Sequence, residues 1–212
     1  MQQQPLQSHT VPPKIIDEHI LVVKRDILFP TTAWNGLMTD NFDYYVAVVQ
    51  QHKEFYPRSL MEQDPTYKQI IPYLIFTHNN HYFLMQRHKK ASEQRLHSKL
   101  SLGIGGHVRQ EDLEGTTLFD WARREFHEEV TYAGNLTIRP IGLLNDDSNE
   151  VGKVHLGFVL LLAGDSPEIT IKSELAHGSL VSLQECAAGY DRMETWSQFV
   201  LTTLLKEENQ SS

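Results

Sequence analysis

One amphipathic helix in the middle of the chain combines a core-facing stripe with a cluster of acids. Glu125, Glu128 and Glu129 stand at positions i, i+3 and i+4, so a helix places their side chains on one face. Apolar residues recur at helical spacing on the opposite face, at Leu118, Ala122, Phe126 and Val130. The pattern predicts a helix that packs on a core through one side and presents three like charges on the other.

Three like charges at this spacing repel one another unless a positive group lies among them. Carboxylate oxygens are ligands that Mg²⁺ and Mn²⁺ prefer, so a divalent cation is the simplest candidate. A solvated acidic helix face is the alternative, and it is the commoner origin of a bare E-x-x-E-E pattern. The glycine-rich turn at residues 103–106 favours the cation, because glycine lets backbone groups approach a metal ion or a phosphate closely.

Residues 124–129, with the sequence REFHEE, resemble the Nudix hydrolase signature G-x5-E-x7-R-E-U-x-E-E-x-G-U, in which U is apolar. Gly106 corresponds to the opening glycine, although four residues are inserted between it and Arg124. Two further segments, LHSKLSLGIGGHV and KQIIPYLIF, look like a bacterial subgroup of predicted Nudix-type phosphoesterases. The resemblance is close in the helix and looser in the loop before it.

That loop departs from the signature at its first glutamate. Thr116 stands at this position, and we expect Asp112 to replace the missing acid. Thr131 stands where the signature has its late glycine, and we expect Gly134 to end the helix in a left-handed cap. Two other acids in the lengthened loop are alternatives to Asp112, namely Glu111 and Glu114.

The resemblance implies a metal-dependent hydrolase that attacks a phosphorus atom with water, using Mg²⁺ or Mn²⁺. The metal ligands carried over from the signature are Glu125, Glu128 and Glu129, with a backbone carbonyl of the glycine turn, at Gly105 or Gly106, as a further ligand. The expected catalytic residues are Glu128, Glu129, Arg124 and Asp112. Arg124 is expected to orient a glutamate through a charge-assisted hydrogen bond rather than to contact the substrate.

The substrate is expected to bind beside the glycine turn. Arg95 and Lys99 belong to the most basic stretch of the chain, QRHKKASEQRLHSK, which leads directly into that turn. We predict that both side chains clamp an anionic substrate and that the Gly105 backbone contacts it. The alternative interpretation of the stretch is a solvated loop.

The general base is left open between several residues. In the family this group is sometimes a signature glutamate and sometimes an acid on a later loop, where Asp146, Asp147 and Glu150 lie. Each of the three is more often a turn residue than a base. His107 and His127 could titrate near neutrality, although a lone histidine is more often structural.

Hydrophobic periodicity predicts an α/β fold, an α/β/α sandwich around a mixed central sheet, and the resemblance implies the same Nudix-like fold. Asn79 and Asn80 tolerate positive φ and predict a tight hairpin, while Thr117 and Asp120 form an S/T-x-x-D capping pair. Residues 30–40 and 56–66 are expected to be loops, and 145–152 a polar turn. Strands are predicted at 18–23, 26–29, 70–77, 82–87, 100–108, 135–144, 154–162 and 168–171, and helices at 42–52, 182–187 and 193–205.

Composition limits the partners of the chain. The net charge of −8 argues against bulk nucleic acid, and a longest apolar run near residues 158–163 argues against a membrane span. The single cysteine, Cys186, fits a reducing cytoplasm, where we expect the protein to reside. We expect residues 1–14 to be a disordered tail, 15–206 a single domain with an N-terminal elaboration at 15–68, and 207–212 a frayed end. The expected partner is a small phosphorylated substrate, and a homodimer is left open.

Two other functions compete with the metal-dependent pyrophosphohydrolase. A Nudix-like binding or sensor module would keep the fold without turnover, and Thr116 with the lengthened loop favours this alternative. An isomerase of isoprenoid diphosphates would need an active-site cysteine near the front of the domain. Cys186 lies too far along the chain for that role.

Overall fold

The computed structural model describes residues 17–87, 99–112, 117–172 and 176–211. Two long strands, β4 (Tyr67–His78) and β10 (His155–Gly164), form the centre of its main sheet and run parallel to each other. The other neighbouring strands of this sheet pair antiparallel. The mixed sheet predicted from the sequence is confirmed. From one edge of this sheet to the other, the strand order is β12 (Ala176–Val181), β5 (His81–Arg87), β4, β10, β9 (Leu136–Asn145) and β2 (Gly36–Met38).

Shorter strands complete the edge of β4. Along its length, β4 pairs in turn with β1 (His19–Lys24), β7 (Gly103–Gly105) and β5. Strand β3 (Glu54–Pro57) extends β1, and β6 (Leu100–Ser101) extends β5. A separate two-stranded sheet is formed by β8 (Val130–Tyr132) and β11 (Ile169–Ile171).

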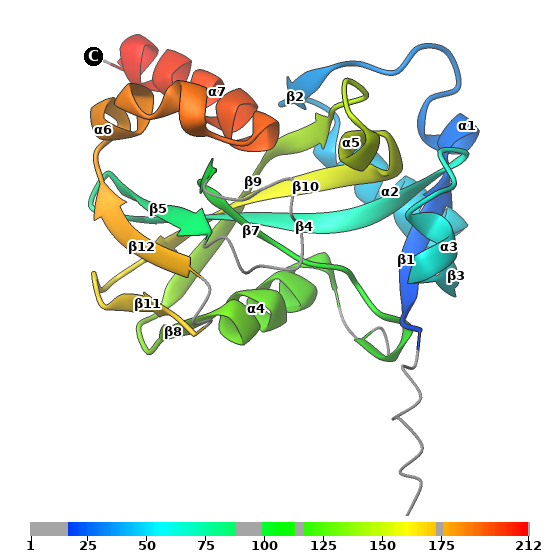
Figure 1. Cartoon of the computed structure of the whole chain (residues 1–212), viewed down its shortest axis with the longest axis horizontal. Helices are drawn as coiled ribbons and strands as arrows, with labels where there is room; N and C mark the ends of the chain where they lie inside the picture. Colours follow the sequence, from blue (N-terminus) through cyan, green and yellow to red (C-terminus); the bar gives the residue numbers. More distant parts are fainter. Residues whose placement is uncertain (1–16, 88–98, 113–116, 173–175, 212) are drawn as a thin grey trace, which may run out of the picture.

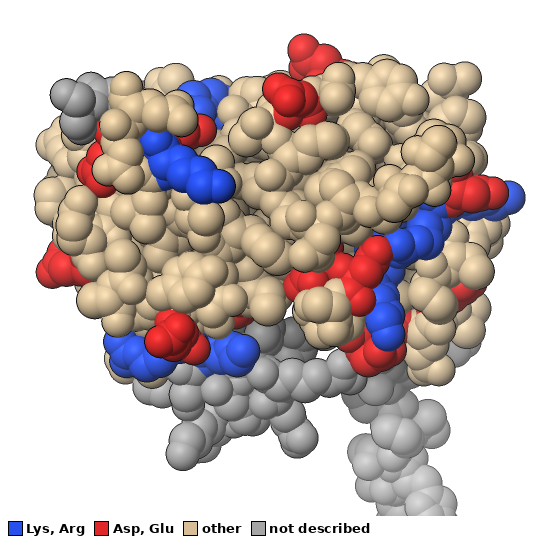
Figure 2. Space-filling view, turned by 90° about the horizontal axis from the view of Figure 1, so that it is seen from above, with Lys and Arg blue, Asp and Glu red and all other residues tan. Residues whose placement is uncertain are grey.

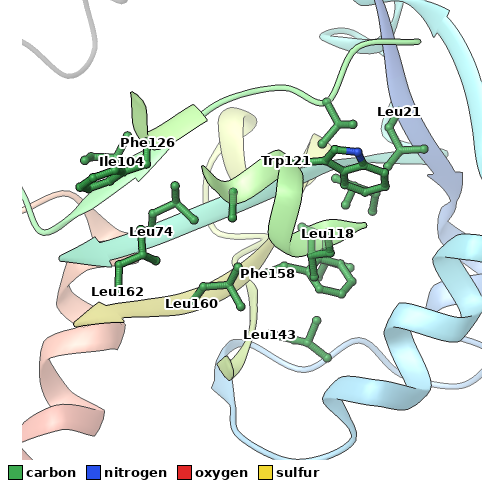
Figure 3. Close-up of a cluster of buried hydrophobic side chains, with 14 of the residues drawn as sticks. Leu21, Leu74, Ile104, Leu118, Trp121, Phe126, Leu143, Phe158, Leu160 and Leu162 are labelled. Atoms are coloured by element: carbon green, nitrogen blue, oxygen red, sulfur yellow. The ribbon is translucent and has the colours of Figure 1, made fainter. Parts of the chain in front are cut away.

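Helices cover both faces of the central sheet (Figure 1). Helix α4 (Leu118–Glu129) lies on one side, and α6 (Leu183–Ala188) and α7 (Thr195–Ser211) lie on the other. Alternate residues of β4 and β10 enter two different cores, as the period of two in a strand requires. Leu74 and Phe158 share a core with the apolar face of α4 (Figure 3), whereas Ile75 packs with α6 and α7.

Several local predictions are confirmed. Asn79 and Asn80 have φ values of 47° and 60° and join β4 to β5. The side chain of Thr117 caps α4 and forms a capping box with Asp120. Helix α2 spans Phe42–His52, as its apolar pattern predicts. Strand β10 is buried along most of its length, as a central strand covered on both faces should be.

Other predicted boundaries were wrong. Helix α4 ends at Glu129 rather than near Gly134, because Val130 adopts an extended conformation and pairs with Ile171. The predicted strand at 26–29 is the short helix α1 (Arg25–Leu28), and the predicted turn at 145–152 contains the start of α5 (Glu150–Val154). The predicted loops at 30–40 and 56–66 contain β2 and α3 (Arg58–Met61), and the predicted strand at 100–108 is divided into β6 and β7.

A charged cluster fixes α5 against the sheet. Lys68 is fully buried, and its Nζ donates hydrogen bonds to Asp147 Oδ1 at 2.9 Å and to the Gly152 carbonyl at 2.8 Å. Arg25 Nη1 also donates to Asp147 Oδ1, at 3.0 Å. Burial lowers the pKa of Lys68 to about 8, although the hydrogen bond to Asp147 opposes this shift. Asp147 therefore compensates a buried cation and positions the helix that lines the site described below.

The helices in the described parts of the chain are all too short or too polar to cross a membrane.

We expect Asp147→Asn to lower the free energy of unfolding by about 2 kcal/mol near neutral pH, because it leaves Lys68 buried without its counter-charge. Asp147 is about one-third exposed, which keeps the loss below that of a fully buried pair. Urea denaturation measures the change. Glu62→Gln, at an exposed pair with Arg58, is the control and should cost no more than about 0.5 kcal/mol. Equal losses in the two variants would contradict this role.

The same loss should depend on pH. Partial burial raises the pKa of Asp147, but hydrogen bonds and charges from Arg25 and Lys68 outweigh it and hold the pKa well below its usual 3.8. The stabilisation is thus present above pH 3.8 and is lost as the pH falls below that value. The wild type and Asp147→Asn should converge in stability in acid.

Candidate functional site

A cavity of about 600 Å³ lies where β7, α4, α5 and the start of α7 come together. All three acids predicted from the helix pattern line it, as do Gly105 and Gly106. Opposite charges lie close together here, and Figure 2 shows acidic and basic side chains next to one another on one face of the molecule. The basic residues that line the cavity are Arg58, Lys99, Arg109 and Arg124.

The glycine turn packs directly against the first acid of the helix. Strand β7 pairs with β4 so that Gly105 lies opposite Tyr73, and Gly106 follows at the end of the strand. A Cβ atom built on Gly106 would lie 1.9 Å from Glu125 Oε1, so no larger residue fits without moving the carboxylate. The backbone at Gly106 and the Glu125 carboxylate therefore form one surface.

Glu125 is a buried carboxylate at this surface. Its side chain is 9% exposed. Burial, supported by the charges of Glu128 and Glu129, raises the pKa of Glu125 to about 7, against the opposing charge of Arg124. A buried acid with a raised pKa in a cavity is typical of a functional site.

Two arginines hold Glu128 from different directions. Arg124 Nη1 donates to Glu128 Oε1 at 2.7 Å, and Arg109 Nη2 donates to the same oxygen at 3.3 Å. Asp112 connects the two arginines, because its Oδ2 lies 2.9 Å from Arg124 Nη2 and accepts a hydrogen bond from the Arg109 backbone N–H at 2.9 Å. Arg124 thus makes a charge-assisted hydrogen bond to a glutamate of its own helix.

The oxygen-rich surface suits a hard divalent cation, but the described side chains do not enclose one. No group of three or more His, Cys, Asp and Glu residues among them has the spacing of a metal site. Glu128 is directed toward the arginines, whereas Glu125, the exposed Glu129 and Gly106 all line the cavity. Two carboxylates and a glycine backbone fit Mg²⁺ or Mn²⁺, which keep several water ligands.

Of the other residues predicted to belong to the site, some line the cavity and others do not. Lys99 lines the cavity, whereas Arg95 lies outside the described residues, as do Glu114 and Thr116. Asp112 is 7% exposed at its side chain and anchors the arginines behind the cavity wall. Of the acids proposed as a general base, Glu150 lines the cavity, while Asp146 and Asp147 are not among the lining residues. Asp146 accepts hydrogen bonds from Ser148 and from the lining residue Thr195, and Asp147 accepts one from Lys68.

The two histidines differ in position. His107 lines the cavity, and burial, with the nearby Arg58 and His155, lowers its pKa to about 3. Of the two alternatives for His107, titration near neutrality is therefore excluded, because burial and a nearby cation keep its imidazole neutral. His127 is exposed on α4 and is not part of the cavity lining.

Comparison with known proteins places the chain in a family. No family model matches the sequence. Protein YmaB of Bacillus subtilis is 36% identical over 207 residues, which is 89% of this chain and 98% of YmaB. The crystal structure of Tm1382, described as a candidate Nudix hydrolase, superposes with a TM-score of 0.77 at 31% identity, covering 89% of this chain and 99% of that one.

The chain belongs to the Nudix hydrolase superfamily. A third similarity concerns the fold alone: the Nudix domain of Shewanella oneidensis NrtR, crystallised with ADP-ribose, has a TM-score of 0.50 at 11% identity, covering 68% of this chain and 88% of that one. Helix α4 is therefore the Nudix helix, and the α/β sandwich predicted from the sequence is the fold of the superfamily.

Several residues of this Nudix site were not predicted from the sequence. Arg109 follows the glycine turn by three positions, and its place in the GGHVR segment could have suggested a role. Arg58 comes from the N-terminal elaboration, where no local pattern indicates it. Tyr73 and Trp196 belong to apolar runs that look like ordinary core, yet both line the cavity.

We expect Glu125→Gln to stabilise the metal-free Nudix protein at pH 8 by about 1–2 kcal/mol, because it removes a carboxylate whose ionisation is unfavourable when buried. Thermal unfolding with a chelator present measures the effect. Glu129→Gln changes an exposed acid of the same helix and should leave the stability nearly unchanged. A Glu125→Gln variant less stable than the wild type would show that burial does not dominate the energetics of this carboxylate.

Proposed function

We propose that the protein is a divalent-cation-dependent Nudix hydrolase that cleaves a phosphoanhydride bond in a nucleoside diphosphate-linked or related small phosphorylated compound. One observation carries the proposal: a single cavity brings the acidic face of the Nudix helix and the glycine turn together with four basic side chains. Membership of the superfamily supports the same reaction class.

The cation would be held by Glu125 and Glu129 together with the backbone at Gly106. Glu125 lies against that backbone, and Glu129 lines the cavity one helical turn further on. Bound there, Mg²⁺ or Mn²⁺ supplies Lewis-acid polarisation of a phosphoryl oxygen and lowers the pKa of water. Ion binding would also stabilise the ionised form of Glu125, which burial disfavours.

The basic residues would bind the phosphates. Arg58, Arg109 and Lys99 line the cavity and offer N–H donors to anionic oxygens. Arg124 has a positioning role, since it is held between Glu128 and Asp112. In hydrolysis the oxygen of water attacks phosphorus, the bond to the bridging oxygen breaks, and the water proton must pass to a base. Glu150 is the candidate base, because it is the acid of the later loop that lines the cavity.

A nucleotide-binding module without turnover is the second candidate. The observation that favours it is the engagement of Glu128 by two arginines, which leaves two carboxylates of the Nudix helix for a cation. Retained ligand binding without hydrolysis across a substrate panel would favour this second function.

Glu129→Gln should reduce Mg²⁺-stimulated monophosphate release from a panel of nucleoside diphosphate-linked compounds by at least about 100-fold, because loss of even an outer partner of a metal costs ~10- to 100-fold. The change removes a charge and keeps the side-chain shape. Arg123→Gln, at an exposed position of the same helix that is not among the cavity-lining residues, is the matched control and should retain activity. Full activity of Glu129→Gln would refute the assignment of this residue.

A further inference from the structure

We infer that Glu194 and Trp196 form a recognition subsite for the part of the substrate that is not phosphate, and that this subsite selects a nucleobase carrying an exocyclic amine. Both residues line the cavity at the start of α7, which covers the opposite face of the sheet from the Nudix helix. The inference rests on the proposed function, because it assumes that the phosphates bind near α4.

Glu194 is fixed in place through one of its two oxygens. Its Oε1 accepts hydrogen bonds from the hydroxyls of Tyr73 at 2.7 Å, Ser101 at 2.6 Å and Ser197 at 3.1 Å. Two of the donors come from the sheet, and Tyr73, Ser101 and Ser197 are all buried. The carboxylate is therefore positioned by a rigid network before any ligand arrives.

The second oxygen of Glu194 makes no hydrogen bond or ion pair with the described residues. Two cations lie near Glu194 along the backbone: Lys99, whose neighbour Leu100 accepts a hydrogen bond from the Glu194 backbone N–H through its carbonyl, and Arg192, two residues before Glu194. Neither of these described side chains forms an ion pair with Glu194. A carboxylate with one saturated and one open oxygen is an acceptor for a donor on the ligand. The ligand group that meets Glu194 must carry an N–H or an O–H.

Trp196 provides a flat surface beside this acceptor. Its ring packs edge-on against Tyr73, with centroids 5.3 Å apart and an interplanar angle of 83°. Gly157 of β10 lies against the six-membered ring of the indole, because a Cβ there would be 2.9 Å from Trp196 Cζ3. The indole is thus held on the strand while it remains only partly buried and lines the cavity. A planar aromatic group can stack on such a surface.

The two features together define the ligand chemistry. Stacking on Trp196 requires a planar ring, and the open oxygen of Glu194 requires a donor at the edge of that ring. An amino-bearing nucleobase supplies both, whereas a sugar hydroxyl supplies the donor without an aromatic face. Buried or fixed acceptors discriminate strongly against ligands that lack the matching donor.

Calorimetric binding to the full chain tests the subsite directly. The ligands are AMP and GMP, their amine-free counterparts purine riboside 5′-monophosphate and inosine 5′-monophosphate, ribose 5-phosphate, and inorganic pyrophosphate. At least one amino nucleotide should bind about tenfold tighter than its amine-free counterpart, and Glu194→Gln should remove that preference. Trp196→Ala should reduce nucleotide binding to the level of ribose 5-phosphate, while Trp196→Phe keeps a ring and should retain most of it.

The outcomes separate this inference from the proposed function. Pyrophosphate binding without any preference for amino nucleotides would overturn the subsite and leave the phosphate site standing. Nucleotide binding that is unchanged in Glu194→Gln and Trp196→Ala, with both variants folded by circular dichroism, would also overturn it. If neither pyrophosphate nor any nucleotide binds, the subsite and the proposed function both fail.

Discussion

The close contact between the Gly106 backbone and the Glu125 carboxylate is the constraint on which the site depends. It arises because β7 pairs with the middle of β4 and ends where the Nudix helix crosses, and because residue 106 has no side chain. The apolar face of α4 holds the helix on the same sheet through Phe126 and Trp121 (Figure 3). Packing energy from the core therefore keeps an acid in a place where water cannot fully solvate it.

That position gives the carboxylate a raised pKa and makes a compensating cation favourable. The neighbouring arginines do not neutralise Glu125 fully, because Arg124 is directed toward Glu128 and Asp112. On this helix, Arg124 and Glu128 form a structural ion pair, whereas Glu125, next to them in the sequence, remains available for a cation. A comparable separation occurs beneath α5, where Asp147 compensates the buried Lys68 and leaves Glu150 at the cavity.

The parts of the fold that the sequence predicts are those with a local cause. The spacing of the acids and of Phe126 predicts the Nudix helix, and Asn79–Asn80 predicts the central hairpin, because each pattern reports directly on backbone geometry. The short helices α1 and α5 were missed, since their few residues are positioned by contacts with distant parts of the chain. Arg58 and Trp196 were missed as site residues for the same reason: the sheet brings them to the cavity from opposite ends of the sequence.

Crystallography of the protein soaked with Mn²⁺ and a non-hydrolysable diphosphate analogue would locate the cation and the phosphates in the cavity. We predict an anomalous peak between the carboxylates of Glu125 and Glu129 and the backbone at Gly106, with the diphosphate extending toward Arg109 and Arg58. An ordered diphosphate without a Mn²⁺ peak at this position, or glutamates turned into bulk solvent, would contradict it.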